Sequence, residues 1–447
     1  MAEGTAVQKP SAEVHDGTGN NANTTAKCKG FLFHPDLSWL DKLLSALMHI
    51  FIPYRRLYNS PITSPLTQET KDALQIFRSS VRNGNTSPFK SKLAQLEKDY
   101  SWGSLLITLS RKHDILETWG ILQQVNENPD NSFRQGQESV PVLVFGPSRL
   151  LDPVNQTIAV ETTADVPIIV WFHGGGMISG QADDNMALSD VRKMLEMTGG
   201  TNEDKSKRNV LLISVDYGLS PESPFPNAVI DGLSVVEHFA NTYPSSSLHI
   251  AGISAGGNLS AVVTMESVRR YPGRVKSSII IHPMLDPRAN SDSYHSNARA
   301  SMLHHEWMRW CWRAYLLETN ENVSDRITAS EHTQLIINCK WLNNSIPGND
   351  TVWKRLINPV HDLPSASQMS KTKFFICAAK GDLLYDEGQE FAMACINRMS
   401  TMDPKSNNIS YIETRGDHST ALLFDKQQRN AKMKSWSEHV FDAHNSS

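Results

Sequence analysis

From about residue 140 onward, short apolar runs of mostly β-branched residues alternate with stretches of helical periodicity. Runs that are apolar on both faces and separated by helices are typical of a parallel sheet, because helices cover both of its sides. The predicted strands are Val140–Phe145, Val166–Phe172, Val210–Val215, Leu248–Gly252, Ser278–Ile281, Phe374–Ala379 and Ile409–Glu413. The pattern predicts a doubly wound α/β domain, with its functional site at the carboxyl ends of the strands.

One connection in this series is much longer than an ordinary loop. About ninety residues separate the strand that ends at Ile281 from the strand that begins at Phe374. They include an amphipathic helix with a common face formed by Leu303, Trp307, Trp310, Ala314 and Leu317. Because connections of this length are uncommon in compact domains, we predict an inserted helical cap at about residues 290–357. The Trp-rich face is either cap core or part of an acyl pocket.

The N-terminal third of the chain has a different texture. Residues 1–30 are rich in Ala, Gly, Asn and Thr and are predicted to form a disordered tail. Residues 31–130 show helical patterns and no clear strand, and an amphipathic helix from Leu37 to Ile52 ends near Pro53. We expect this segment to contribute to the cap, and residues 131–447 to form the catalytic domain.

Composition narrows the functional classes. The formal net charge of −4 and the absence of a long basic run give no electrostatic reason to bind nucleic acid. The five cysteines are odd in number and widely spaced, which favours free thiols over disulfides or a zinc site. The first twenty residues lack the apolar core of a secretory signal peptide, and Leu37–Ile52 is too short and too interrupted to span a bilayer. A cytoplasmic location is therefore expected.

The segment Gly252-Ile253-Ser254-Ala255-Gly256 joins a predicted strand to a predicted helix that runs from Asn258 to about Arg269. This strand–turn–helix context is the one that a nucleophile elbow requires. Glycines flank the serine because a Cβ at either position would collide with the neighbouring strand and helix. The helix also directs its unsatisfied N–H groups toward the serine. We therefore predict that Ser254 is a catalytic nucleophile.

A run of glycines follows an earlier predicted strand. His173-Gly174-Gly175-Gly176 comes directly after Val166–Phe172. Attack by a serine on an ester produces an anionic tetrahedral intermediate, which N–H donors about 3 Å away stabilise. We predict that the amides of Gly174, Gly175 and Ala255 form this oxyanion hole. His173 is predicted to hold the loop by hydrogen bonds rather than to act as a base.

A serine hydroxyl is a poor nucleophile unless a base removes its proton, so the site needs a histidine. In this architecture the acid and then the histidine follow the serine along the chain, each after a later strand. Asp382 follows the strand Phe374–Ala379, and His418 follows the strand Ile409–Glu413. We predict that His418 is the general base and that Asp382 orients it.

Other acidic and imidazole side chains are weaker candidates. Asp386 is the main rival to Asp382, but it comes later and, with Glu387, fits the acidic first turn of a helix. Asp417 is adjacent to the proposed base, so its side chain should point away from it. Three further histidines lie in the region of the predicted cap, namely His304, His305 and His361.

Taken together, these residues resemble the hormone-sensitive-lipase family of α/β-hydrolases. The resemblance covers roughly residues 139–440 and is strongest in five blocks, namely His173–Gly176, Val215–Glu222, the elbow, Gly381–Gly388 and Gly416–Ser419. It implies an eight-stranded, mostly parallel sheet under a helical cap, no metal or cofactor, and hydrolysis of carboxylic esters through an acyl-enzyme. It also implies that Glu222 buttresses the catalytic loops.

The sequence departs from the family pattern at three positions near the site. Gly218 stands where the family usually carries arginine, and Ser220 stands where alanine is usual. Ile253 replaces an acidic residue or threonine in the elbow. These changes affect the pocket and the cap more than the triad, so the substrate of a relative cannot be transferred to this chain.

Several functions remain open at this point. The leading prediction is a serine esterase that acts on a small-molecule ester with a small or medium, hydrophobic acyl or alcohol group. A ligand-binding protein resembling the plant gibberellin receptor is an alternative, but such receptors lack the triad histidine, whereas His418 is present here. A membrane-associated lipid esterase, with Leu37–Ile52 lying in the interface, is less favoured than a cap helix. A peptidase or formamidase is permitted by the fold, and the oligomeric state is open.

Overall fold

The computed structural model describes residues 67–122, 137–159, 166–197, 209–298, 303–317, 327–343, 350–404 and 406–418, together with the helical residues 434, 437 and 440. The predicted tail at residues 1–30 and the predicted helix Leu37–Ile52 lie outside these described residues. Among the described residues, no helix combines the length and the apolar character needed to cross a membrane.

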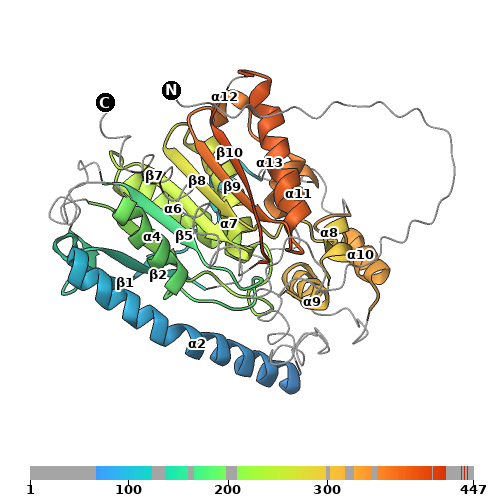
Figure 1. Ribbon diagram of the computed structural model, residues 1–447, viewed down its shortest axis with the longest axis horizontal. Helices are drawn as coiled ribbons and strands as arrows, with labels where there is room; N and C mark the ends of the chain where they lie inside the picture. The colour runs from blue at the N-terminus through green and yellow to red at the C-terminus, as the bar shows by residue number, and fades with distance from the viewer. Residues whose placement is uncertain are drawn as a thin grey trace.

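The core of the molecule is an eight-stranded sheet with the order β1-β2-β6-β5-β7-β8-β9-β10 (Figure 1). Its strands are β1 (Trp102–Ser110), β2 (Ser139–Pro147), β5 (Ile168–Phe172), β6 (Leu211–Val215), β7 (Leu248–Ile253), β8 (Val275–Ile281), β9 (Lys373–Ala379) and β10 (Ile409–Thr414). The pairs β1–β2 and β2–β6 are antiparallel, and the remaining pairs are parallel. Every predicted strand is therefore present, and the prediction of a mostly parallel sheet is confirmed.

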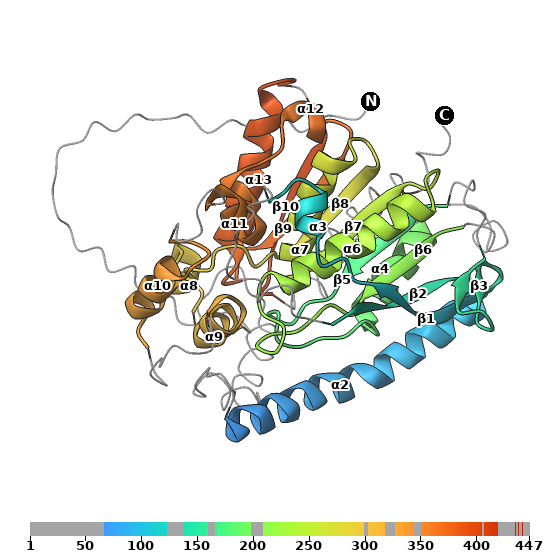
Figure 2. The same ribbon diagram turned by 180° about the vertical axis from the view of Figure 1, so that it is seen from behind.

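Helices cover both faces of this sheet (Figures 1 and 2). On one face lie α6 (Asn227–Thr242), α7 (Ala255–Arg270) and α13 (Tyr385–Ser400), whose apolar side chains join the larger core cluster. On the other face, α4 (Asn185–Met197) and the C-terminal half of α2 (Gln68–Tyr100) form a second cluster. The central strands β5 and β6 are fully buried, which explains why they read as continuous apolar runs in the sequence.

The remaining elements are short and lie at the edges of this framework. They are α3 (Ile115–Thr118), the 3₁₀ turn η4 (Ser148–Leu150), β3 (Leu151–Asp152), β4 (Thr157–Ile158), α8 (Asp292–Ser296), α9 (His305–Leu316), α10 (Ala329–Asn338), α11 (Asp350–Ile357), the 3₁₀ turn η5 (Pro359–His361) and α12 (Ala366–Met369). Strands β3 and β4 pair with each other in a separate two-stranded sheet.

Strand β1 lies in a part of the chain where the sequence analysis predicts only helices. It occupies the sheet edge and pairs along its whole length with β2, from Trp102 opposite Pro147 to Ser110 opposite Ser139. Its side chains alternate between buried and exposed positions, but Leu106 is 58% exposed on the solvent side. An apolar residue on the wet face obscures the alternation by which a half-buried strand is recognised, and this explains the missed strand.

Helices α8 to α11 fall within the stretch predicted to form a cap. Figures 1 and 2 place α8, α9 and α10 together beside one end of the sheet. The predicted amphipathic helix corresponds to α9, in which Trp307, Trp310 and Ala314 are buried as expected. Its opposite side is also buried, including Trp312 and Arg313. Helix α9 is thus packed on all sides rather than on one face.

Candidate active site

The serine predicted as nucleophile occupies a sharp turn between β7 and α7. Ser254 has φ 59° and ψ −118°, a conformation that costs free energy for a non-glycine residue and persists only where the surroundings hold it. A Cβ on Gly252 would lie 2.1 Å from the carbonyl oxygen of Gly256, and a Cβ on Gly256 would lie 2.0 Å from that of Phe172. Both glycines are therefore required sterically, as the elbow interpretation predicts.

Hydrogen bonds fix the elbow on both sides. The amide of Ser254 donates to the carbonyl of Ile281 at 2.9 Å, and the carbonyl of Ser254 accepts from Asn258 at 3.0 Å and from Met284 at 3.1 Å. Ala255 is buried and begins α7 directly after the serine. The nucleophile thus lies at the N-terminus of a long, buried helix, where the partial positive charge of the helix favours a developing anion.

The glycine run lies next to this elbow. Gly174 approaches it so closely that a Cβ there would be 3.2 Å from the carbonyl oxygen of Ile253 and 3.4 Å from the Cβ of Ser254. Gly175 and Gly176 have φ values of 125° and 67°, which favour glycine. A Cβ on Gly175 would lie 2.0 Å from the carbonyl oxygen of Ser179. Only glycines allow this backbone to lie against both the serine and its own following turn.

His173 is a buried scaffold residue. Its Nδ1 donates to the carbonyl oxygen of Gly174 at 2.8 Å, and its ring stacks on Tyr217 with centroids 4.2 Å apart. The hydroxyl of Tyr217 in turn donates to the carbonyl of His173 at 2.8 Å. Burial lowers the pKa of the imidazole below its ordinary value, so its neutral form is favoured. These contacts agree with a role in holding the glycine loop.

Asp382 and His418 meet across loops that follow β9 and β10. Nδ1 of His418 donates to Oδ2 of Asp382 at 2.6 Å, and both side chains are buried. The other oxygen of Asp382 accepts from the amide of Leu384 at 3.2 Å, and the side chain of Asn297 donates to the Asp382 carbonyl at 2.8 Å. The carboxylate is thus held by two hydrogen bonds, and its backbone carbonyl by a third.

Burial opposes the charged form of His418, but the charge and hydrogen bond of Asp382 outweigh it. The pKa of His418 therefore lies above its ordinary value, with a smaller contribution from the nearby Asp417. A raised pKa strengthens the imidazole as a base, which suits proton transfer from a hydroxyl.

The weaker candidates have other partners. Asp386 accepts from the amide of Ser293 at 2.7 Å and lies in the first turn of α13. His304 caps α9, and His305 lies 3.1 Å from Glu306. His361 ends the 3₁₀ turn η5 and, like these other side chains, is not among the residues that line the cavity at Ser254.

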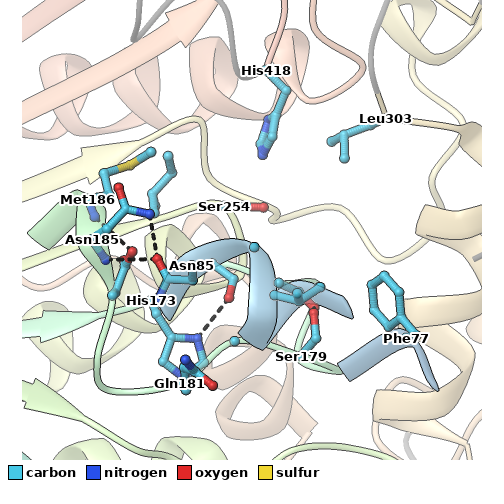
Figure 3. A pocket seen from close by; sticks show the side chains of 18 of the residues that line it. Phe77, Asn85, His173, Ser179, Gln181, Asn185, Met186, Ser254, Leu303 and His418 are labelled. Atoms are coloured by element: carbon cyan, nitrogen blue, oxygen red, sulfur yellow. Dashed lines mark hydrogen bonds between the residues drawn. The ribbon is translucent and has the colours of Figure 1, made fainter. Parts of the chain in front are cut away.

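A cavity of about 610 Å³ brings the predicted residues together. Ser254, His418, Gly174 and Gly175 all line it, and Figure 3 shows the ring of His418 directed toward Ser254. The apolar part of its lining consists of Ile253, Leu303, Trp307, Met308 and Phe77. Polar side chains also line it, namely Gln181, Asp184, Asn85 and Asn185.

Glu222 does not contact the catalytic side chains directly. Its carboxylate binds Arg78 of α2 through two hydrogen bonds of 2.8 Å. The same guanidinium donates to the carbonyls of Ile178 and Ser220. Any support that Glu222 gives to the catalytic loops therefore passes through Arg78, a residue on which the sequence analysis places no role.

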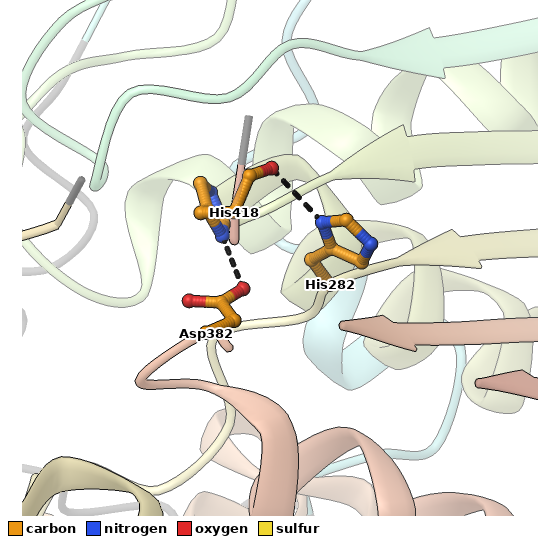
Figure 4. Close-up of side chains that lie close together, drawn as sticks. All are labelled: His282, Asp382 and His418. Atoms are coloured by element: carbon orange, nitrogen blue, oxygen red, sulfur yellow. Dashed lines mark hydrogen bonds and ion pairs between the residues drawn. The ribbon is translucent and has the colours of Figure 1, made fainter. Parts of the chain in front are cut away.

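His282 is a second residue that the sequence analysis misses. Its Nδ1 donates to the backbone carbonyl of His418 at 3.0 Å, as Figure 4 shows, and its backbone has φ 42°. It follows β8 directly, so its place at the carboxyl edge of the sheet could have been inferred from the predicted strand. Ligand atoms of His282, Asp382 and His418 lie within 4.8 Å of one another. The hydrogen bonds among these residues explain why they lie together: Asp382 pairs with the imidazole of His418, and His282 holds the backbone of His418.

Comparisons with known proteins agree with this fold. A sequence model of the alpha/beta hydrolase fold matches residues 169–400. The chain is 26% identical over 191 residues to the gibberellin receptor GID1B of Arabidopsis thaliana, covering 39% of this chain and 49% of the receptor. It is 28% identical over 169 residues to the carboxylic ester hydrolase LipN of Mycobacterium tuberculosis, covering 36% and 42%. The chain thus spans about half the length of the curated relatives that it matches.

A solved structure supports the fold across nearly the whole chain. An alpha/beta hydrolase enzyme from the metagenome of Lake Arreo, Spain, superposes with a TM-score of 0.54 at 18% identity, covering 93% of this chain and 99% of that enzyme. At this identity the likeness establishes the fold alone. The family is established by the sequence model, which matches more than half of the chain, together with the motifs at the strand ends. The chain belongs to the hormone-sensitive-lipase and carboxylesterase type of the alpha/beta hydrolase fold family.

Proposed function

We propose that this protein is a serine hydrolase that cleaves carboxylic esters of small to medium, hydrophobic substrates through an acyl-enzyme intermediate. The observation that carries the proposal is the 2.6 Å hydrogen bond between His418 and Asp382, with Ser254 and the glycine loop lining the same cavity as His418. The apolar part of the cavity lining, with Trp307 and Phe77, supports a hydrophobic acyl or alcohol group.

In the first half-reaction, Nε2 of His418 takes the proton of Ser254 while Oγ forms a bond to the ester carbonyl carbon. The amides of Gly174, Gly175 and Ala255 stabilise the oxyanion, and each lost donor would cost about 3–4 kcal/mol of the barrier. Asp382 holds the imidazole in the tautomer with its proton on Nδ1 and stabilises the imidazolium. When the C–O bond breaks, His418 gives its proton to the leaving alcohol.

In the second half-reaction, water replaces the alcohol. His418 removes a proton from the water as its oxygen attacks the acyl carbon, and the same proton then passes to Oγ of Ser254 as the acyl–serine bond breaks. The products are a carboxylic acid and an alcohol, and Ser254 and His418 return to their starting states. This cycle uses only side chains and backbone amides that line or adjoin the cavity.

A ligand-binding function is the second candidate, and the match to the gibberellin receptor GID1B favours it. The pairing of His418 with Asp382 opposes it, because a protein that only binds a ligand has no use for an activated base beside a serine. The two functions differ in turnover, which a direct assay measures.

The test is hydrolysis of p-nitrophenyl acetate, butyrate and octanoate by the wild type and by Ser254→Ala. Loss of the nucleophile should lower kcat by about 10⁶. A fluorophosphonate probe should label the wild type at Ser254 and leave the variant unlabelled. An unlabelled wild-type protein without turnover on any ester would overturn the proposal and favour the ligand-binding function. Cleavage of amides in preference to esters would favour a peptidase or formamidase.

A further inference from the structure

Helix α2 lies outside the stretch matched by the family model, yet it reaches the loops around the proposed site. Arg78, in its N-terminal third, makes four hydrogen bonds. Nε donates to the carbonyl of Ile178 at 2.8 Å, and Nη2 donates to the carbonyl of Ser220 at 2.9 Å. Nη1 and Nη2 each donate to one carboxylate oxygen of Glu222 at 2.8 Å. A planar guanidinium paired in this two-pronged way is fixed in orientation as well as in position.

The first of these carbonyls belongs to the turn that continues the glycine loop. The amides of Ile178 and Ser179 donate to the carbonyl of Gly175 at 3.1 and 3.0 Å, so residues 175–179 form one closed turn. Gly175, Gly176 and Met177 have consecutive positive φ values of 125°, 67° and 64°, respectively. Met177 is the strained member of this series, because a side chain rarely adopts that backbone conformation. A turn of this kind persists only if neighbouring groups hold it.

Two contacts hold the carbonyls of this turn from outside the cavity lining. The amide of Ser220 donates to the carbonyl of Met177 at 2.8 Å, and Arg78 binds the next carbonyl, that of Ile178. Arg78 also binds the carbonyl of Ser220 itself, so it joins the glycine-loop turn and the loop 220–222 into one unit. Ile178 and Ser220 are both fully buried, so a lost partner there could not be replaced freely by water.

Glu222 completes this arrangement from the other side. Its side chain is about half exposed. Partial burial raises the pKa of Glu222, but the hydrogen bonds and charge of Arg78 lower it by more, so the pKa lies below its ordinary value. The family's arginine position in the same motif is Gly218 here, and a Cβ there would lie 2.4 Å from Oγ of Ser223. The guanidinium beside Glu222 therefore comes from the N-terminal helix rather than from the motif itself.

We propose that Arg78 is a positioning residue for the oxyanion hole, and that Glu222 acts on the site by holding Arg78. The inference rests on the proposed function of Ser254 and on the assignment of Gly174 and Gly175 as donors. Through the Ile178 carbonyl, Arg78 maintains the strained turn that follows Gly175 and so keeps the loop amides in place. It makes no contact with the substrate.

Loss of Arg78 should therefore impair the transition state more than substrate binding. A displacement of about 1 Å in a catalytic group can cost about 10² in rate. For Arg78→Met we expect kcat on p-nitrophenyl butyrate to fall by roughly this factor, while KM changes by less than about threefold. Glu222→Gln should have a smaller effect, because the amide oxygen still accepts from Arg78 and the two carbonyl contacts remain.

A transition-state analogue separates positioning from general damage. A trifluoromethyl ketone forms a tetrahedral adduct with the serine, and its oxyanion uses the same donors as the reaction. Its inhibition constant should rise in Arg78→Met by about the same factor as kcat/KM falls. Adding Glu222→Gln to Arg78→Met should cause no further loss, because the two residues act through one contact.

Arg82→Met is the matched control, since Arg82 lies one turn further along the same helix, is exposed and takes no part in these contacts. It should leave kcat and the inhibition constant unchanged. Free guanidinium should partly restore the activity of Arg78→Ala, because the vacated site is near the surface and Arg78 is about 28% exposed. If Arg78→Met fails to fold, two milder variants provide the same comparison. Arg78→Lys keeps the positive charge but loses the two-pronged pairing, and Glu222→Gln weakens the partner of Arg78.

The outcomes separate this inference from the proposed function. An active wild type with an equally active Arg78→Met variant, or a variant that changes KM alone, would overturn the role of Arg78 and leave the esterase function standing. A fall in kcat without a parallel loss of ketone affinity and without rescue by guanidinium would also overturn it. A wild type that neither turns over esters nor reacts with a fluorophosphonate would remove both proposals.

Discussion

The pair formed by His418 and Asp382 shows how a single contact sets the chemistry of this site. The imidazole is buried, which alone would lower its pKa, yet the adjacent carboxylate holds the pKa above its ordinary value of 6.5. A raised histidine pKa adds stability to the folded state at low pH, and this contribution is lost as the pH rises through the folded-state pKa. Activity follows the opposite trend, because the base acts only when it is neutral.

Asp382→Asn is the corresponding prediction. We expect kcat to fall by about 10⁴, because an amide cannot stabilise the imidazolium and permits the wrong tautomer. In the wild type, kcat/KM should rise with pH through a midpoint above 6.5, and in the variant the midpoint should move to lower pH. The measurement is the pH profile of p-nitrophenyl butyrate hydrolysis by both proteins.

Asp386→Asn is the control for this variant, since Asp386 lies in the same sequence block but binds the amide of Ser293. It should keep the wild-type midpoint and most of the activity. A larger loss of activity in Asp386→Asn than in Asp382→Asn would show that the wrong carboxylate has been assigned to His418.

Helices α2 and α9 contribute apolar side chains to the cavity, although neither belongs to the sheet. Phe77 of α2 and Trp307 of α9 meet edge to face with centroids 5.0 Å apart. Both line the cavity together with Leu303 and Met308. The elbow and the base are supplied by strand ends, whereas the space available to the substrate is set by these two helices.

Phe77→Ala should therefore change chain-length preference. Removing the ring enlarges the apolar part of the cavity, so kcat/KM for octanoate should rise relative to that for acetate by roughly tenfold. The free energy of unfolding should fall by about 3–5 kcal/mol, as is usual for a buried phenylalanine. The measurements are the ratio of kcat/KM values for the p-nitrophenyl esters and a urea titration.

Phe89→Ala separates the two effects. Phe89 is equally buried on the same helix but packs on Phe145, with centroids 5.9 Å apart, and is not among the cavity-lining residues. It should lower stability without changing the ratio for octanoate and acetate. Equal changes of that ratio in both variants would mean that Phe77 acts through helix packing and not through the shape of the cavity.

A buried ion pair connects the β1 edge of the sheet to helix α6. Arg111, directly after β1, donates to Asp231 of α6 at 2.7 Å and to Asn227 at 2.5 Å. Burial raises the pKa of Asp231 despite this guanidinium, so the carboxylate depends on its partners. Its other oxygen accepts from the amide of Gly218 at 2.9 Å, within the motif that leads to Glu222.

Arg111→Met should destabilise the molecule as a whole by about 3–5 kcal/mol, because it leaves a buried carboxylate without a cation. The double variant with Asp231→Asn should be less destabilised than the single variant, since the orphaned charge is removed. Urea unfolding followed by circular dichroism measures both. A double variant that loses the sum of the two single effects would indicate that the residues stabilise the fold independently.

Local patterns in the sequence were sufficient for the strands and for the elbow. The steric need for Gly252 and Gly256 arises within one strand–turn–helix unit, and continuous apolar runs mark strands covered on both faces. Strand β1 was not predicted. It is an edge strand with one face in water, and the exposed Leu106 on that face interrupts the alternation of apolar and polar residues. Such signals depend only on neighbours along the chain, so they can be read without knowledge of the fold.

The tertiary structure alone decided which distant groups meet. The sequence favours Asp382 over Asp386 by its place in the loop, but the loop geometry after β9 is what brings the first against His418 and the second against Ser293. Arg78 and Glu222 are 144 residues apart, and no local pattern connects them. Their meeting depends on where the packing of the whole molecule places α2 beside the sheet. Local sterics act within a few residues, whereas the pairing of remote side chains follows from the sheet order and the burial of the entire core.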